Sequence, residues 1–189
     1  GGGTVAGHDI VSEPEKVKQS IGYMSQKFSL YEDLTPFENL RFYLGVYSVT
    51  PALWPERIDW VLKMTRLQSS RDRLTKELPP GWRQRLALGC SLLHKPEVLF
   101  LDEPTSGVDP VTRRHFWDFI GQIANEGITV FVTTHYMDEA QFCRRIVMID
   151  AGVIVAAGTP QEIIAAACPR RRDADLNDAF IALMSRRDK

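Results

Sequence analysis

The sequence predicts an α/β fold, a parallel sheet flanked by helices, with an inserted helical subdomain. Two continuous apolar runs, Val98–Leu101 and Ile128–Val132, are typical of strands that are buried on both faces. A helical pattern lies between them, and a shorter one leads on to a third apolar run, Ile146–Ile149. Strands that alternate with helices in this way form a parallel sheet covered by helices.

The first part of the chain has short elements. Thr4–Ile10 is compatible with a strand that ends at Asp9, and Ile21–Met24 with a short buried strand that stops at Ser25-Gln26. Residues 35–38 read Thr-Pro-Phe-Glu, which places a capping threonine, a first-turn proline and the glutamate of a capping box in the right order. We therefore expect a helix from position 36, with its aromatic and leucine side chains facing a core.

Two more helices are expected before the first long apolar run. One opens near Pro55, and one runs from Trp82 to His94, where Pro96 ends it. Because residues 34–95 are mostly helical and interrupt the strands, we interpret them as an inserted subdomain. Residues 1–33 and 96–160 then form the sheet-bearing core.

The later elements follow from local signals. Pro110 and Gly127 bracket a helix over 110–125, and Met137–Cys143 suggests a short one. Ala151-Gly152 predicts a hairpin turn from the third apolar run into residues 153–155. Two C-terminal helices are expected near 160–167 and 175–185, and we assign residues 161–189 to this C-terminal helical part.

Composition limits the function classes. At 44% hydrophobic and 25% charged the chain is globular, and a net charge of −1 argues against a dedicated nucleic-acid binder. No apolar run approaches the roughly 18–20 residues of a membrane span. Three cysteines without metal-type spacing indicate reduced thiols in a cytosolic protein. The start at Gly1, without methionine or signal peptide, predicts a fragment of a larger protein that lacks the N-terminal part of its domain.

Two adjacent carboxylates, Asp102 and Glu103, follow the strand at Val98–Leu101. Ligands of open α/β sheets bind at the carboxyl ends of strands. One carboxylate can hold a hard cation such as Mg²⁺, and the other can orient a water for attack on a phosphoryl group. Taken alone, the pair is equally compatible with two solvated carboxylates at the entry to a loop.

Two further polar side chains follow strands. His135 comes shortly after Ile128–Val132, so it should emerge at the same sheet edge and could hydrogen-bond a phosphate or the attacking water. Gln26 follows Ile21–Met24, and its carboxamide could bind Mg²⁺ or position water. Either residue by itself would more often be structural or merely exposed.

The segment Pro104–Pro110 forms a tight loop directly after the carboxylates, because it is rich in turn-forming proline and glycine. It could be only a connector from strand to helix. Its position beside the expected water site makes Ser106 and Asp109 candidates for a functional role.

Four segments together resemble the ATP-binding cassette (ABC) ATPases, whose fold is like that of P-loop NTPases. Leu101–Pro110 (LDEPTSGVDP) resembles the Walker B motif and D-loop, and Gln26 in IGYMSQ resembles the Q-loop. His135 in VTTHYMDEA resembles the switch histidine, and Leu78–Leu86 (LPPGWRQRL) stands where the family signature belongs. The resemblance covers nearly the whole chain. The details of residues 26–35 are most similar to subunits of bacterial drug and antibiotic exporters.

The resemblance implies roles for these residues. Glu103 would be the catalytic base, Asp102 and Gln26 would bind Mg²⁺ with its waters, and His135 would contact the γ-phosphate of ATP. Asp109 would cross the interface with a second ABC ATPase domain, a homodimer partner or a fused one. The segment after Gln26 would contact a transmembrane permease, at the cytoplasmic face of the inner membrane. Some of the aromatic residues of this region, such as Phe28, Tyr31 or Phe37, could form the groove that receives it.

The chain departs from the family pattern in two places. No G-x-x-x-x-G-K-[ST] phosphate loop occurs in it, so we expect it to bind ATP poorly and to be inactive alone. The signature Leu-Ser-Gly-Gly-Gln reads Leu78-Pro79-Pro80-Gly81-Trp82, and prolines supply no N–H. We expect a weakened contact with the partner's ATP and an asymmetric pair of sites.

Three function classes stay open. The leading one is the ATP-binding subunit of an ABC exporter, which couples Mg·ATP hydrolysis to transport. The second is a soluble ABC ATPase that acts on ribosomes or nucleic acid, although the long charged insertions of that class are absent. The third is a non-catalytic regulatory cassette, which Pro79-Pro80 and the missing phosphate loop favour and the presence of Glu103 and His135 opposes.

Overall fold

The computed structural model describes residues 1–27 and 29–187. Phe28, one of the residues expected to form a groove, lies outside the described residues. The chain divides into two compact units, Gly1–Thr133 and Thr134–Lys189, and each is described by itself. No helix of the described part is long and apolar enough to cross a bilayer.

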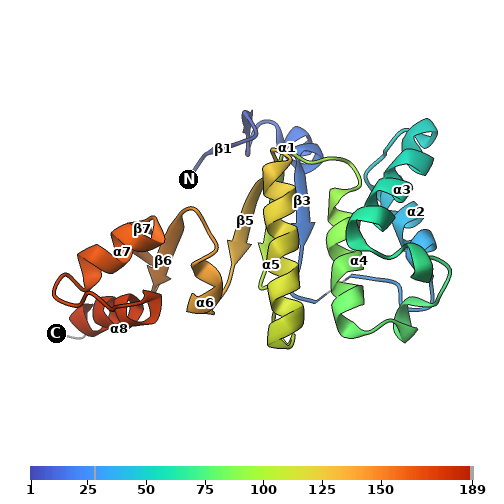
Figure 1. Cartoon of the computed structure of the whole chain (residues 1–189). Helices are drawn as coiled ribbons and strands as arrows, with labels where there is room; N and C mark the ends of the chain where they lie inside the picture. Colours follow the sequence, from blue (N-terminus) through green and yellow to red (C-terminus); the bar gives the residue numbers. More distant parts are fainter. Residues whose placement is uncertain (28, 188–189) are drawn as a thin grey trace. The chain divides into compact units, whose positions relative to one another are not determined.

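The first unit contains the predicted parallel sheet, which has three strands (Figure 1). β4 (Val98–Asp102) lies between β3 (Ile21–Met24) and β5 (Thr129–Thr133), and both neighbours run parallel to it. Leu99 and Leu101 are buried, and α4 (Pro80–Leu92) packs against β3. Gly22 is required here, because a Cβ at this position would collide with the carbonyl oxygen of Ser91. The sheet is therefore closely fitted to α4.

Three helices form the mostly helical part of this unit. α2 (Pro36–Val46), α3 (Trp54–Thr65) and α4 surround one core, with short 3₁₀ turns at Pro51–Leu53, Gln68–Ser70 and Thr75–Glu77 (Figure 1). Both hydrogen bonds of the predicted capping box form between Thr35 and Glu38. The helix predicted from about Trp82 forms and begins at Pro80, two residues earlier, because the fixed φ of proline suits the first helical position.

The N-terminal segment differs from the expected single strand. β1 (Thr4–Val5) and β2 (His8–Asp9) form a small antiparallel hairpin, because Ala6 and Gly7 both adopt positive φ, 49° and 78°. α1 (Pro14–Ser20) follows, a helix that the sequence analysis did not predict. It has no buried residue, so it lacks the apolar periodicity that would have predicted it.

α5 (Pro110–Asn125) runs over the predicted range and packs against β5. It buries an aromatic stripe that includes Phe116 and Phe119. The helix begins at the end of the loop that follows β4, so only a few residues separate its first turn from Asp102 and Glu103 in the sequence.

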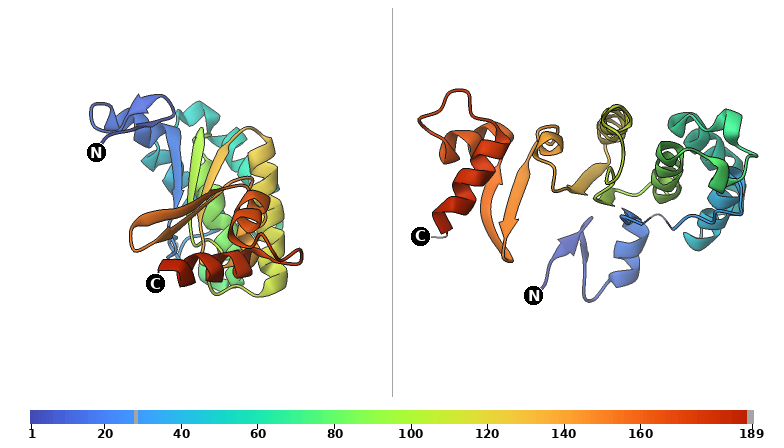
Figure 2. Two further views of the ribbon diagram at one scale, coloured as in Figure 1. Left: turned by 90° about the vertical axis from the view of Figure 1, so that its left-hand side faces the viewer. Right: turned by 90° about the horizontal axis from the view of Figure 1, so that it is seen from below.

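The second unit consists of α6 (Met137–Ala140), β6 (Ile146–Asp150), β7 (Val153–Gly158), α7 (Pro160–Ala167) and α8 (Leu176–Arg187). β6 pairs with β7 in an antiparallel two-stranded sheet, so the expectation that the third apolar run extends the parallel pattern is wrong. The predicted turn forms, with Ala151 and Gly152 at φ 46° and 75°. Figure 2 shows this hairpin beside α7 and α8, which share a small core with Met148.

Candidate functional site

The carboxyl ends of the parallel strands bring polar residues together. The register pairs Met24 with Leu101 and Asp102 with Thr133, so the three strands end side by side. Gln26 lies two residues beyond the end of β3, and Glu103 directly beyond the end of β4. The topology thus positions three strand ends at one edge, as the sequence predicts.

Gln26 and Glu103 are in direct contact. The Gln26 Nε2 donates a hydrogen bond of 2.8 Å to the Glu103 Oε2. The bond uses an amide hydrogen of Gln26 and leaves its amide oxygen as the atom that could bind a cation. These two candidate residues come from segments that are 77 positions apart, so only the sheet brings them together.

Glu103 has an unusual backbone conformation. Its φ is 44°, in the left-handed region that a non-glycine residue adopts at a cost of about 1 kcal/mol or more. Its N–H donates to both the carbonyl and the hydroxyl oxygen of Thr133, each at 3.1 Å, and its carbonyl accepts from Ser106 N–H at 3.1 Å. The neighbouring strand and the following loop therefore hold the conformation.

Asp102 is held by a residue that the sequence analysis missed. Thr133 Oγ1 donates to Asp102 Oδ1 at 2.6 Å. The same hydroxyl accepts from the Glu103 backbone N–H, so it contacts both residues of the pair. In the sequence, the available signal was Thr133 itself, a polar residue at the end of the strand that lies beside Asp102. The second carboxylate oxygen of Asp102 could face a ligand.

The loop after the carboxylates contains one buried and two exposed polar residues of interest. Thr105 is buried, whereas Ser106 and Asp109 are exposed. Asp109 caps α5 by accepting from the N–H groups of Val111 and Thr112 at 3.1 and 3.0 Å. Hydrogen bonds from the Thr112 side chain and backbone hold the pKa of Asp109 below its usual value. Asp109 is thus a charged cap as well as a candidate interface residue.

The signature position lies at the start of α4. Pro79 and Pro80 are exposed and supply no N–H, while the N–H groups of Trp82 and Arg83 donate to the Pro79 carbonyl at 2.9 and 3.1 Å. Gly81 is therefore the first-turn residue whose amide could meet an anion. The Trp82 indole is half-buried and packs against the core of α2, α3 and α4, so part of its surface is used for packing and is not open to a ligand.

One residue of α4 was not singled out from the sequence. Gln84 is fully buried, and its Nε2 donates to the carbonyl oxygen of Pro104, directly after Glu103. A glutamine inside a helix gives no sign in the sequence of which backbone group it meets. Gln84 connects the signature helix with the carboxylate segment.

His135 lies in the second unit, two positions after the last residue of β5. Its side chain is exposed, and its ring centroid lies 4.0 Å from that of Tyr136. The preceding Thr134 accepts from Tyr136 N–H at 3.1 Å and donates to Glu139 Oε2 at 2.7 Å, which orders this turn. The convergence of His135 with Gln26 and Glu103 stays a prediction.

The residues fit a magnesium ion that is held mainly by a nucleotide. No group of three or more His, Cys, Asp and Glu side chains within residues 1–27 and 29–187 could by itself hold a metal. Mg²⁺ commonly needs only one or two carboxylates, because phosphates and waters complete its shell. The oxygens of Asp102 and Gln26 are the matching donors.

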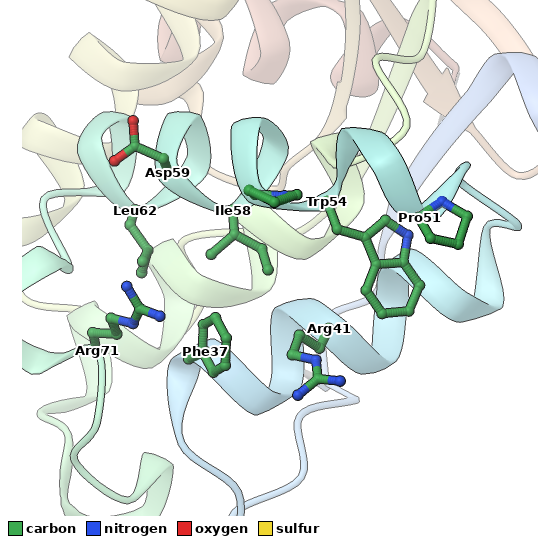
Figure 3. Close-up of a pocket in the computed structure, with 9 residues that line it drawn as sticks. Phe37, Arg41, Pro51, Trp54, Ile58, Asp59, Leu62 and Arg71 are labelled. Atoms are coloured by element: carbon green, nitrogen blue, oxygen red, sulfur yellow. The ribbon is translucent and has the colours of Figure 1, made fainter.

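Of the aromatic residues expected to form a groove, the described ones, Tyr31 and Phe37, lie at different features. The Tyr31 ring lies edge-on to Phe42, with centroids 4.6 Å apart and the two side chains 48% and 42% exposed. Phe37 instead lines a pocket of about 460 Å³ between α2 and α3, which does not include Tyr31 (Figure 3). There the guanidinium groups of Arg71 and Arg41 lie over its ring, 4.2 and 5.8 Å from the centroid.

These features define a class of protein. An α/β domain with a carboxylate pair, a carboxamide and a capped helix at the ends of parallel strands is built as the nucleotide-binding ATPase domains are. A family model described as ABC transporter matches residues 1–106, and the chain belongs to this family, whose members bind ATP and are generally ATPases. A model of an AAA domain also matches residues 84–137.

Several curated relatives are named as ATP-binding proteins of multidrug transport or drug resistance. The probable multidrug ABC transporter ATP-binding protein YbhF of Escherichia coli is 47% identical over 186 residues, which is 98% of this chain and 32% of that protein. The daunorubicin/doxorubicin resistance protein DrrA of Streptomyces peucetius is 41% identical over 86% of this chain and 50% of its own length. The linearmycin resistance protein LnrL of Bacillus subtilis is 38% identical over 85% and 52%. The chain therefore spans about a third to a half of these relatives.

Solved structures share the fold. An ATP-binding subunit of an ABC transporter superposes with a TM-score of 0.79 at 24% identity, covering 96% of this chain and 75% of that one. The protein cbiO1 of Clostridium perfringens, described as part of the cbiONQ transporter complex, gives 0.77 at 24% identity, with 88% and 72% covered. The predicted fold class is confirmed.

Proposed function

We propose that this chain is the ATP-binding part of an ABC exporter, in which Mg·ATP hydrolysis drives the export of a substrate. The contact between Gln26 Nε2 and Glu103 Oε2 is the observation that carries the proposal. It joins a residue that can sense a phosphate with a residue that can activate water. The names of the curated relatives support drug or antibiotic export.

The proposed roles are those that the family resemblance implies, and the contacts among Gln26, Asp102 and Glu103 at the strand ends support them. Glu103 orients and deprotonates the attacking water as its carboxylate, while Asp102 and the Gln26 amide oxygen bind Mg²⁺ or its waters. His135 contacts the γ-phosphate. In a head-to-tail pair of such domains, Ser106 and Asp109 face the partner domain. Mg·ATP supplies the phosphoryl group and the cation that balances its charge.

Residues 29–35, which come shortly after Gln26, are attached firmly to α2, and this arrangement suits a lever. Asn39 is fully buried and bonds the backbone N–H and carbonyl of Tyr31, as well as the Thr35 carbonyl and the Thr75 hydroxyl. The Tyr43 hydroxyl donates to the Ser29 carbonyl. A displacement of Gln26 on phosphate binding would therefore carry α2 with it.

A transmembrane permease is the proposed receiver of this movement, at the cytoplasmic face of the membrane. Tyr31 and Phe42 present an exposed aromatic pair at the end of the lever, and exposed aromatics suit protein contacts. The pocket around Phe37 adds a second apolar surface on α2, with Arg41 and Arg71 at its edge (Figure 3).

The phosphate-binding loop is proposed to come from outside these 189 residues. In support, the register places Tyr23, Phe100 and Phe131 side by side across the sheet, and Tyr23 and Phe131 are 56% and 54% exposed. An aromatic row on a sheet face favours a covering element. Without the loop, the 189 residues alone would hydrolyse no ATP.

Pro79 and Pro80 support a pair of unequal ATP sites. They remove the serine hydroxyl and the amides that a signature would offer, so the contact to the partner's ATP rests on Gly81 and the α4 N-terminus. Glu103 serves the other site. A non-catalytic regulatory cassette is the alternative that these same prolines favour.

The test uses the full-length protein that contains this chain. Purified with its native partners, it should hydrolyse Mg·ATP and bring down a polytopic membrane protein. Recovery of ribosomes instead would favour the soluble class of ABC ATPase. Intact protein that binds its membrane partner but hydrolyses no ATP would favour the regulatory cassette and contradict the proposal.

A further inference from the structure

Gln84 is a buried polar side chain within the signature helix. It lies in the second turn of α4 and is 0% exposed, and the buried residues of this helix continue from Leu86 to Leu92. Its Nε2 donates to the Pro104 carbonyl, while its Oε1 meets no donor among the described residues. A buried amide with one unmet oxygen is less favourable than an apolar side chain of the same shape. Stability alone therefore does not explain a glutamine here.

The group that Gln84 holds is adjacent to the catalytic carboxylate. Pro104 follows Glu103, whose φ of 44° requires support from its surroundings. On one side, Thr133 accepts the Glu103 N–H through its carbonyl and hydroxyl oxygens, each at 3.1 Å. On the other side, Gln84 holds the next carbonyl. Glu103 is thus fixed between β5 and α4.

A second close contact joins α4 to the same connection. A Cβ on Gly81 would lie 2.6 Å from Thr112 Cγ2, so the first turns of α4 and α5 touch at this point. The segment from Pro104 to Thr112 is therefore held by α4 at both of its ends. A movement of the α4 N-terminus would be transmitted to Pro104 and on to Glu103 through packed atoms and one hydrogen bond.

We propose that Gln84 is a positioning residue for hydrolysis, which fixes the Glu103 carboxylate from the signature helix through the Pro104 carbonyl. The inference rests on the proposed ATPase function and deepens it. It links the two ends of one domain: α4, whose start faces the partner's nucleotide, and Glu103, which acts at the domain's own nucleotide. Contact of the signature with a nucleotide would then help to align the base at the other site.

The test is Gln84→Met in the full-length protein, because methionine fills a similar volume and cannot donate. We expect kcat to fall by about 10- to 100-fold, the effect of misplacing a reacting group. The KM for Mg·ATP should stay within about twofold, since binding contacts are kept. If the methionine variant does not fold, Gln84→Asn carries the same expectation, because its shorter amide cannot reach Pro104.

Two controls separate positioning from mere stability. Ser91→Ala removes another buried side-chain bond of α4, from Ser91 Oγ to the Leu88 carbonyl at 2.7 Å, and should leave kcat near wild type. In a Glu103→Gln background, Gln84→Met should cause no further loss of the single-turnover rate, because both changes act through one carboxylate.

The outcomes distinguish the two proposals. Equal losses from Gln84→Met and Ser91→Ala, or the same loss of rate with and without the Glu103 carboxylate, would overturn the role of Gln84 and leave the ATPase function standing. A wild-type protein without ATPase activity, or a Glu103→Gln variant with unchanged activity, would contradict the proposed function and this inference with it.

Discussion

The Gln26 amide nitrogen lies 2.8 Å from the Glu103 carboxylate oxygen, although 77 positions separate the two residues in the sequence. Gln26 begins the segment that Asn39 and Tyr43 attach to α2, and Glu103 begins the loop that leads to α5. The contact therefore joins the proposed chemical site to both of the segments proposed to carry its state elsewhere.

The first prediction concerns Glu103. Glu103→Gln in the full-length protein should lower kcat for Mg·ATP by about 10²- to 10⁴-fold, because an amide cannot accept a proton from water. Phosphate release is the measurement, with the exposed Glu126→Gln on the same unit as the control. Retention of more than a tenth of the activity would show that Glu103 is not the base.

The signature prolines give a second prediction. Pro79→Ser should not reduce turnover, because Pro79 is exposed, makes no side-chain cap and would gain a hydroxyl that can meet a phosphate. Steady-state ATPase assays of both variants check it. An equal loss from Pro79→Ser and Glu103→Gln would refute the asymmetric pair of sites.

The fit of β3 to α4 gives a prediction about stability. Gly22→Ala should lower the free energy of unfolding by about 1–3 kcal/mol or more, because the added methyl group collides with the Ser91 carbonyl oxygen. Gly45→Ala on α2 is the control, since no atom lies within 4 Å of its added Cβ and alanine favours a helix by up to about 1 kcal/mol. Urea unfolding of the two variants should shift in opposite directions.

Asn39 gives a prediction about the lever. Asn39→Leu should destabilise the protein by about 2–4 kcal/mol, because it leaves the part-buried backbone groups of Tyr31 and the buried Thr75 hydroxyl without their partner. Hydrogen exchange should show the largest loss of protection in residues 31–35. Uniform exchange across the unit would mean that Asn39 does not fix this segment locally.

His94 predicts a loss of stability in mild acid. Burial lowers the pKa of His94, its Nε2–H donates to the Ile21 carbonyl at 2.8 Å, and its buried Nδ1 has no partner within the described part of the chain. Charged Arg57 nearby lowers the pKa further, and the Tyr47 ring stacks on the imidazole at 3.9 Å.

The sign follows from linkage. In the unfolded chain His94 takes up a proton near pH 6.5, whereas in the folded protein it does so only at lower pH. The free energy of unfolding should therefore fall as the pH drops from about 7 to 5. His94→Gln keeps a donor for Ile21 and should flatten this part of the stability profile, whereas the exposed His115→Gln should not. Parallel profiles for the wild type and His94→Gln would contradict the assignment.

Local signals predicted several elements correctly because the responsible groups are close in sequence. The capping box of Thr35 and Glu38, the α5 start after Asp109 and the turn at Ala151-Gly152 each need only three or four neighbouring residues. α1 was missed because it buries no side chain. The hairpin of β6 and β7 was predicted, but β6 does not belong to the parallel sheet, because an apolar run does not specify which strands it pairs with.

The sequence by itself determined the alternation of strands and helices and the residue types at the strand ends, including Gln26, Asp102, Glu103 and His135. Both follow from periodicity and from motif spacing along the chain. Only the tertiary structure decided that Thr133 bonds both the Asp102 carboxylate and the Glu103 backbone N–H, that Glu103 adopts a left-handed backbone, and that Gln84 reaches Pro104. These contacts join segments that are 20 to 31 positions apart, and parallel pairing and helix packing, rather than any local preference, bring such segments within hydrogen-bond distance.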